Sequence, residues 1–293
     1  LFLIGAVLPD TPFYILKDPH AFQLRLLGNR VHDTDGHSFE PVIRLLDQFP
    51  DPKEPGLLAL IAGILCHFCA DIVFHPFVYY FCGSRDLVRH FRMESYIDLY
   101  FCQQKEGPPV RYFRELYPGT GMNHQLLFQA VRVFLDAGRE IPDSSLEKIL
   151  RGHARFQRQF DRRFIGFLVR LAGLLPGVRT RELAGLFYPP LKKPFRGKQP
   201  PLFPTEYDYR HPVTDETFTH TIDQLAEKTV NACVSLLELV NQHCIQPPQL
   251  AKALKEREGA NLLTGLPGEK KEKMTRFDTG YSLECLVFGG YNL

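Results

Sequence analysis

The sequence predicts an all-α fold, and three observations support that prediction. Hydrophobic residues make up 44% of the 293-residue chain, which is enough to bury a sizeable core. In several long segments they recur at helical spacing. Alternating runs of Val, Ile and Thr bounded by turn residues, which are typical of hairpins, are nearly absent. We therefore expect a bundle of many helices.

The most apolar segment, 57–81, is long enough to cross a bilayer. It carries His67, Asp71 and His75, and ionisable groups are costly inside a membrane. We therefore interpret the segment as a buried helix of a globular fold, and Pro76 is expected to limit it.

Helical periodicity predicts further helices along the chain. They are expected at 22–31, from 38 onward, and at 86–103, 124–137, 146–175 and 215–242. The helix at 146–175 carries six arginines, which usually form a solvated face. The stretch 188–212 contains seven prolines and is expected to be a long irregular connection, because proline cannot continue a helix.

These segments predict one helical domain over 1–246, which includes the proline-rich connection, and a C-terminal tail over 247–293. The tail is expected to contain a short helix and a mobile lysine-rich stretch at 268–275. We see no internal repeat in the chain.

Charge and cysteine content narrow the function classes. Lysine and arginine total 35 against 33 acidic residues, which does not fit a strongly basic nucleic-acid-binding protein. The seven cysteines lack regular spacing and predict no disulfide framework, and Cys66 and Cys69 are expected to be buried thiols. This cysteine usage and the lack of a visible signal peptide favour the cytoplasm. Because the chain begins with Leu1, we expect it to be a fragment or a processed form.

Histidines and acidic residues in the first hundred positions have the spacing of metal ligands. His67, Asp71 and His75 are four residues apart, so a helix places all three on one face. Burying an ionised carboxylate in so apolar a helix costs several kcal/mol unless it has a strong partner, and a divalent cation is such a partner. His90 and Glu94 repeat the spacing on the next predicted helix.

Together these residues predict two ligand sets of the kind that zinc binds. The first set combines nitrogen and oxygen ligands: Asp10, His32, His67 and Asp71. The second offers two imidazoles and a carboxylate and leaves room for a water: His75, His90 and Glu94. A single His–acid pair is more often an ordinary polar pair, so the prediction rests on the combination.

His37 is a rival of His32 as a ligand, since both lie in VHDTDGHSFE. His37 directly precedes the helix that Ser38 is expected to cap, which would expose its side chain. His32 ends the preceding helix beside its apolar face and is therefore better placed to point inward. Asp33 and Asp35 are near enough in sequence to orient an imidazole.

Three segments also resemble a known family: GAVLPD, GILCHFCADIVFHP and HFRMES. Over residues 1–105, and more weakly through HPVTDETFTHTIDQL, the chain resembles the zinc-dependent phospholipase C family. That family shares its fold with the fungal single-strand nucleases and, more distantly, with the amino-terminal domain of GPI-specific phospholipase D. The resemblance implies a multi-helix bundle with a zinc cluster in a cleft.

The resemblance further implies a zinc-dependent hydrolase that cleaves phospholipid headgroup phosphodiesters by attack of a metal-bound hydroxide. Asp10 would orient or deprotonate the water, and contact with a membrane surface would be transient. In the family, a third zinc is held by the residue matching Asp71, a further His and the terminal amine. No His precedes Asp10 here, and Leu1 stands where secreted members have Trp, so a third zinc depends on a missing N-terminus.

Three alternatives stay open from the sequence. A single-strand nuclease or nucleotidase would use the same zinc cluster and stack bases on aromatic side chains, which are abundant here. An HD-type phosphohydrolase would account for His32 and Asp33 but leaves the pair of His90 and Glu94 unexplained. A non-catalytic helical protein stabilised by zinc is the third. A phospholipid or another phosphodiester is the expected partner, and nucleic acid is not favoured.

Overall fold

The computed structural model describes residues 1–15, 17–34, 36–49, 55–103, 124–160, 162–172, 184–188 and 202–289. The described residues form two compact units. The first unit comprises the described parts of 1–75, 111–157 and 227–271, and the second comprises those of 76–110, 158–226 and 272–293. Most of the chain is helical, as the sequence predicts.

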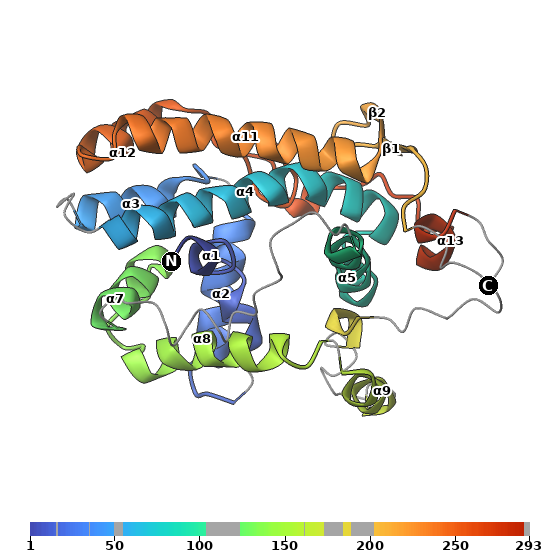
Figure 1. Ribbon diagram of the computed structural model, residues 1–293, viewed down its shortest axis with the longest axis horizontal. Helices are drawn as coiled ribbons and strands as arrows, with labels where there is room; N and C mark the ends of the chain where they lie inside the picture. Colours follow the sequence, from blue (N-terminus) through green and yellow to red (C-terminus); the bar gives the residue numbers. More distant parts are fainter. Residues whose placement is uncertain are drawn as a thin grey trace. The chain divides into compact units, whose positions relative to one another are not determined.

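The first unit consists of helices, and its α-helices are labelled in Figure 1. The helices of this unit are α1 (Phe2–Gly5), the 3-10 helix η1 (Thr11–Tyr14), α2 (Ala21–His32), α3 (Glu40–Gln48), the first part of α4 (Pro55–Cys82), α7 (His124–Leu135), α8 (Asp143–Gln157), most of α11 (Ile222–Gln242) and α12 (Pro247–Glu256). Helix α3 packs against both α7 and α12, while α8 and α2 pack against η1.

Helix α4 supplies the centre of this unit's core. Leu60, Ile64 and Phe68 are fully buried in one hydrophobic cluster with residues of α2, α3, α7 and α12. Residues Gly56–Cys82 are long and apolar enough to cross a membrane. Apolar residues between Leu57 and Cys69 pack among the helices of the first unit, as those of a core helix do.

Two glycines let α1 approach α4 closely. A Cβ atom at Gly63 would lie 2.0 Å from the carbonyl oxygen of Phe2, and one at Gly5 would lie 2.0 Å from that of Leu60. Any side chain at either position would therefore separate the two helices. The contact holds the residues that follow α1 alongside the middle of α4.

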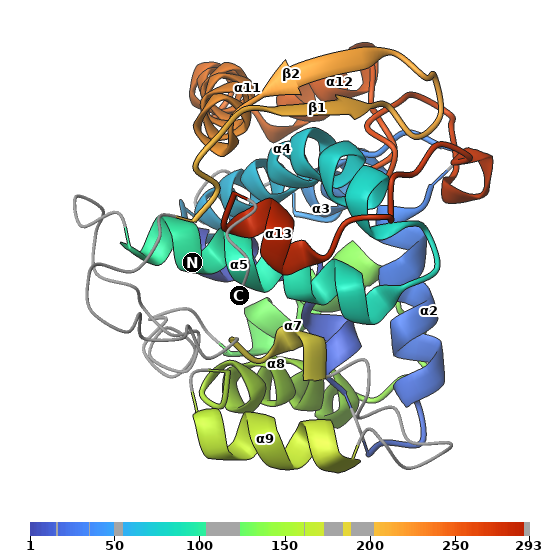
Figure 2. The same ribbon diagram turned by 90° about the vertical axis from the view of Figure 1, so that its right-hand side faces the viewer.

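The second unit combines helices with one β-hairpin, which Figure 2 shows. Its elements are the end of α4, α5 (Leu87–Gln103), α9 (Arg163–Ala172), the 3-10 helix η2 (Ala184–Leu186), β1 (Tyr207–Arg210), β2 (Thr217–His220) and α13 (Leu283–Val287), and a short 3-10 helix η3 (Lys271–Lys273) lies at its border in the sequence. The strands are antiparallel, with Tyr207 opposite His220. Phe77 packs edge-on against Tyr207 and Tyr209, at centroid distances of 5.6 and 5.4 Å.

Strand β2 of the hairpin occupies residues that the sequence assigns to the start of the last long helix. The sequence predicts a helix from residue 215, whereas α11 begins at Ile222. The Thr221 hydroxyl accepts a hydrogen bond from the Gln224 N–H (3.1 Å), and Gln224 Oε1 accepts one from the Thr221 N–H (2.7 Å). This reciprocal pair is a capping box, which fixes the helix start. The preceding Thr and aromatic residues favour a strand.

Two further helix limits differ from the prediction. The single helix expected at 146–175 is two helices, α8 and α9, and Phe160 between them is buried against the rings of Phe187 and Tyr188. Pro76 lies inside α4 and does not end it. An interior proline costs about 3 kcal/mol. Burial of Phe77 directly after it offsets much of that cost, at about 1.5–3 kcal/mol.

The proline-rich connection lies outside the described residues at 189–201, and its last part forms β1. In the predicted tail, Leu250, Leu254 and Leu262 belong to the core of the first unit. The backbone N–H of Thr275, in the lysine-rich stretch, donates to the Pro212 carbonyl (2.9 Å). The domain boundary after residue 246 stays a prediction.

The seven cysteines all lie in described segments and are free. Cys69 is buried and Cys66 is half-buried. Burial raises the pKa of Cys66 to about 12, with a smaller contribution from neighbouring Cys233, so this side chain is a neutral thiol at neutral pH.

Candidate metal centre

Four of the predicted ligands converge in the first unit. His67 and Asp71 are one turn apart on α4, and His67 Nε2 lies 3.2 Å from Asp71 Oδ2. His32, the last residue of α2, has its Nε2 3.6 Å from the same oxygen and 3.2 Å from Asp10 Oδ1. The ligand atoms of Asp10, His32 and His67 all lie within 4.8 Å of one another. We call these four residues the first ligand group.

The turn η1 brings Asp10 to the end of α2. Asp10 directly precedes η1, and the hydroxyl of the fully buried Thr11 donates to the Leu8 carbonyl (2.7 Å), which fixes the turn. Gly28 lets η1 lie close to α2, because a Cβ there would be 3.0 Å from the Pro12 side chain. One turn after Gly28, α2 therefore presents its last residue to Asp10.

Backbone carbonyls orient the imidazoles of the first ligand group. His32 Nδ1 lies 2.9 Å from the Gly28 oxygen, and His67 Nδ1 lies 3.0 Å from the Ala6 oxygen. A carbonyl only accepts hydrogen bonds, so each Nδ1 must carry the proton. In the neutral form of each ring, Nε2 then carries the lone pair that a metal-binding histidine requires.

The spacing of these atoms fits zinc. His32 Nε2, His67 Nε2 and Asp71 Oδ2 are buried, and within the described part of the chain none of them makes a hydrogen bond of ordinary geometry. Ligand atoms about 2.0–2.1 Å from a tetrahedral zinc lie about 3.3 Å apart. Three of the separations among the four ligand atoms, 3.2, 3.2 and 3.6 Å, lie close to that value. An ion at their centre would satisfy atoms whose burial is otherwise costly.

The charges of the group also favour a cation. Burial alone would lower the pKa of His67, but the negative charges of Asp71 and Asp10 outweigh burial and raise that pKa to about 10. Burial would raise the pKa values of the two carboxyl groups, yet His67 and the other nearby imidazoles hold both below the usual range. Two ionised carboxylates thus face a shared space among imidazoles.

The residues predicted for the second zinc are divided between the two units. His75 belongs to the first unit, where its Nδ1 lies 2.7 Å from the Leu262 carbonyl oxygen and 4.0 Å from Asp71 Oδ2. His90 and Glu94 belong to the second unit and lie on α5, where His90 Nε2 is 2.9 Å from Glu94 Oε1. The second ligand set therefore stays a prediction from the sequence and the resemblance.

A distant loop supports the first ligand group. The backbone of Leu262 donates to the His32 carbonyl (3.1 Å) and accepts from His75 Nδ1. The fully buried Asn261 donates from its side-chain amide to Asp33 Oδ1 (2.9 Å) and to the Thr34 carbonyl (2.8 Å). We call residues 261–264 the support loop. It was not predicted, because backbone contacts across more than 180 residues leave no sequence signal.

Asn261→Ala tests the support loop. It leaves the Asp33 carboxylate without its amide partner, so the free energy of unfolding should fall by about 1–3 kcal/mol. Zinc affinity should fall by about 10–100-fold, as when a group that orients a metal ligand is lost. Chelator competition and denaturant unfolding measure the two effects. The exposed Asn29→Ala on α2 is the control. A folded Asn261→Ala protein with unchanged zinc affinity would show that the loop does not position the ligands.

His37 lies apart from the first ligand group. Its Nε2 is 2.6 Å from the Arg257 carbonyl oxygen, and its Nδ1 accepts from the Phe39 N–H (3.3 Å). It is half-buried, whereas the sequence predicts an exposed side chain. Ser38 does not cap α3, because its hydroxyl accepts from the Ala260 N–H (3.1 Å).

Two expectations about supporting residues have different outcomes. Asp33 orients the support loop: besides Asn261, its Oδ1 accepts from the Lys271 N–H (3.0 Å). Asp35 lies outside the described residues.

His153 on α8, which no sequence signal indicated, is buried and stacks on Tyr14 at 4.1 Å. Burial lowers the pKa of His153 to about 4, although the nearby Asp10 opposes this, so it is neutral at neutral pH.

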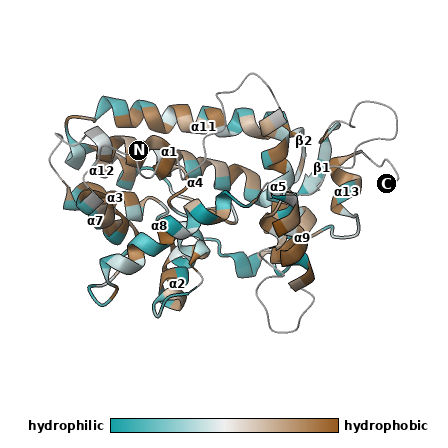
Figure 3. Ribbon diagram, turned by 60° about the horizontal axis from the view of Figure 1, so that its bottom comes forward, coloured by the Kyte–Doolittle hydropathy of each residue, from teal (hydrophilic) through white to brown (hydrophobic). Residues whose placement is uncertain are grey.

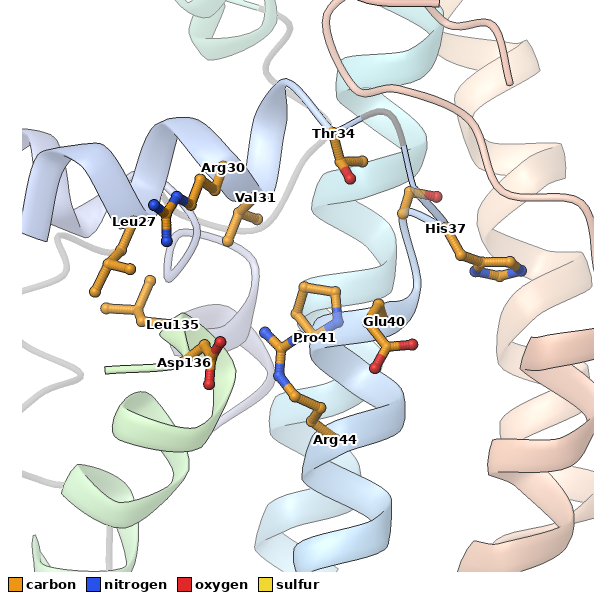
Figure 4. A pocket seen from close by; sticks show the side chains of 11 residues that line it. Leu27, Arg30, Val31, Thr34, His37, Glu40, Pro41, Arg44, Leu135 and Asp136 are labelled. Carbon is orange, nitrogen blue, oxygen red and sulfur yellow. The ribbon is translucent and has the colours of Figure 1, made fainter. Parts of the chain in front are cut away.

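A pocket of about 190 Å³ lies between α2, α3 and the end of α7 (Figure 4). Arg30, Arg44, His37, Glu40 and Asp136 line it with several apolar residues. Ligand sites for drug-sized molecules usually measure about 300–1,000 Å³. The pocket is smaller, and none of the predicted zinc ligands lines it, so we do not assign it to the substrate.

The comparison with protein families agrees with this geometry. Residues 1–137 match the family model described as zinc dependent phospholipase C. No curated protein and no solved structure matches the chain. The matched segment contains every predicted ligand from Asp10 to Glu94. The segment that contains the candidate metal centre is therefore similar to the zinc-dependent phospholipase C family over residues 1–137.

Proposed function

We propose that this chain is a zinc-dependent phosphodiesterase that hydrolyses the headgroup phosphodiester of phospholipids. The observation that carries the proposal is the first ligand group, in which three nitrogen–oxygen separations of 3.2, 3.2 and 3.6 Å lie close to those of zinc ligands. Its location in a segment matched by the phospholipase C family supports the choice of substrate class.

Zinc at this site would supply a Lewis acid for a phosphoryl oxygen and would acidify water at neutral pH. The side chain of Asp10 is 45% exposed, whereas those of His32, His67 and Asp71 are 6%, 9% and 15% exposed. Asp10 is therefore the member of the group that solvent and substrate can reach. Its ionised carboxylate is suited to accept a hydrogen bond from water and so orient it toward phosphorus.

The roles of the other residues follow from their burial. Backbone carbonyls hold the His32 and His67 imidazoles, and Asp71 lies one turn after His67 on the same helix, so these three residues would bind the ion with little rearrangement. Asp71 would be a central ligand of the group, since its Oδ2 lies within 4.0 Å of three imidazoles. We propose His75, His90 and Glu94 as the ligands of a second zinc.

A paired assay tests the proposed function. The purified chain, with zinc restored, is given phosphatidylcholine and single-stranded DNA in parallel, with and without chelator. We expect phosphocholine release that the chelator abolishes, and no DNA cleavage. Zinc-dependent cleavage of DNA alone would replace this proposal by a nuclease. Zinc binding without either activity would favour a helical protein that uses zinc only for stability.

A further inference from the structure

Helix α9 of the second unit exposes an apolar face. Phe164, Phe167, Leu168 and Leu171 are 71%, 54%, 45% and 47% exposed. They are spaced at three, four and seven residues after the first, so one side of the helix carries all four. Figure 3 shows α9 as strongly hydrophobic. Clusters of large exposed apolar side chains usually mark a surface that binds a partner.

The opposite side of α9 is the one that packs. Gly166 is buried, and a Cβ atom there would lie 3.2 Å from the side chain of Phe187. Phe187 is itself 2% exposed and follows η2. Packing within the second unit is therefore satisfied without the exposed face.

Basic residues accompany this face. The sequence from 158 to 172 contains four arginines and one acidic residue. Arg158 and Arg162 are exposed next to the N-terminal end of α9. Arg170, within the helix, lies near enough to Arg92 that burial and the charge of Arg92 together lower its pKa.

We propose that the apolar face of α9 docks the protein on an anionic phospholipid bilayer, with Phe164, Phe167, Leu168 and Leu171 inserted between the headgroups and the nearby arginines on lipid phosphates. Helices that lie in the interface combine Phe and Leu on one side with Arg or Lys on the other. A second copy of this chain is less suitable as the partner, because residues 158–172 of that copy carry four arginines and one acidic residue and so offer little negative charge to the arginines here. The biological purpose of docking rests on the proposed phospholipase function, whereas the exposed apolar face and its arginines are independent of it.

Vesicle sedimentation with the full chain tests docking. The vesicles contain phosphatidylcholine alone or mixed with phosphatidylserine, and the variant carries Phe164→Ser and Phe167→Ser together. Each exposed Phe that inserts should contribute about tenfold in partitioning, so the double variant should bind the mixed vesicles about a hundredfold more weakly. Phe22→Ser is the matched control, because Phe22 on α2 is 72% exposed; it should bind as the parent protein does.

Arg162→Gln tests the contribution of positive charge to vesicle binding. Arg162→Gln should weaken binding to the mixed vesicles by about fivefold, corresponding to about 1 kcal/mol for one basic residue near an anionic surface. Binding to phosphatidylcholine alone should change little. Equal loss on both kinds of vesicle would contradict the assignment of Arg162 to an anionic surface.

Hydrolysis of a short-chain phosphatidylcholine below its micelle concentration separates docking from catalysis. The double variant should cleave this monomeric substrate at the parent rate and the vesicle substrate more slowly. If the parent protein cleaves neither substrate, the phospholipase proposal fails, while sedimentation still decides the docking proposal. Docking is overturned if the double variant sediments like the parent, or if Phe22→Ser loses as much binding. It is also overturned if gel filtration without vesicles shows a dimer that the double variant abolishes.

Discussion

Asp71→Asn is expected to abolish zinc-dependent phosphodiester cleavage while preserving the shape of the side chain. Asp71 Oδ2 is buried and lies 3.2 Å from His67 Nε2 and 3.6 Å from His32 Nε2, so it is central to the first ligand group. An amide carries no charge and binds zinc poorly. Activity should fall by more than about a hundredfold, as when a preorganised charged group is removed from a reaction centre.

The same substitution should also remove the stabilisation that zinc provides. A ligand at a hundred times its dissociation constant contributes about 2.7 kcal/mol to the free energy of unfolding. The melting temperature of the parent protein should therefore fall when chelator is added, and that of the variant should not. Asp47→Asn on α3 is the control, since Asp47 makes a surface ion pair with Lys255 at 3.6 Å. If chelator left the melting temperature of the parent protein unchanged, Asp71 would be an ordinary buried acid and not a zinc ligand.

His32→Ala and His37→Ala are expected to separate the two rival histidines. His32→Ala removes a ligand 3.2 Å from Asp10 Oδ1, so the protein should lose one zinc and nearly all activity. His37→Ala should retain zinc. It should nevertheless lower the free energy of unfolding by about 1–2 kcal/mol, because both ring nitrogens of His37 make hydrogen bonds.

Elemental analysis, activity and denaturant unfolding measured on both variants decide between them. Loss of zinc from the His37 variant and its retention in the His32 variant would mean that the loop between α2 and α3 has a different register. The phosphodiesterase proposal would survive that result, since the remaining ligands would be unchanged.

Local patterns made part of the metal centre predictable. His67 and Asp71 share one helix, so helical spacing alone places their side chains together. Asp10 and His32 come from other elements, so their residue types suggested the grouping with His67 and Asp71, and the resemblance supported it. Their approach depends on Gly5 and Gly63, whose lack of side chains lets α1 cross α4. Glycine in a helix has many causes, so the sequence alone does not reveal that contact.

Some other features leave no signal in the sequence, whereas others leave a signal that the sequence analysis did not use. The support loop holds His32 and His75 through backbone atoms of Leu262, and backbone contacts put no constraint on residue type. The capping box of Thr221 and Gln224 is a sequence signal that would have placed the start of α11 correctly. The apolar face of α9 was not predicted, because the arginines in this segment led us to interpret the helix as solvated.

The zinc content of the purified chain tests the metal centre most directly. The parent protein and Asp71→Asn are purified in the same way, and the zinc per chain of each is measured by elemental analysis after gel filtration. With the first ligand group in place and the proposed second set formed, the parent should contain two tightly bound zinc ions per chain and Asp71→Asn at least one fewer. A parent protein that folds but retains less than one zinc per chain would contradict the assignment of these residues as a metal centre.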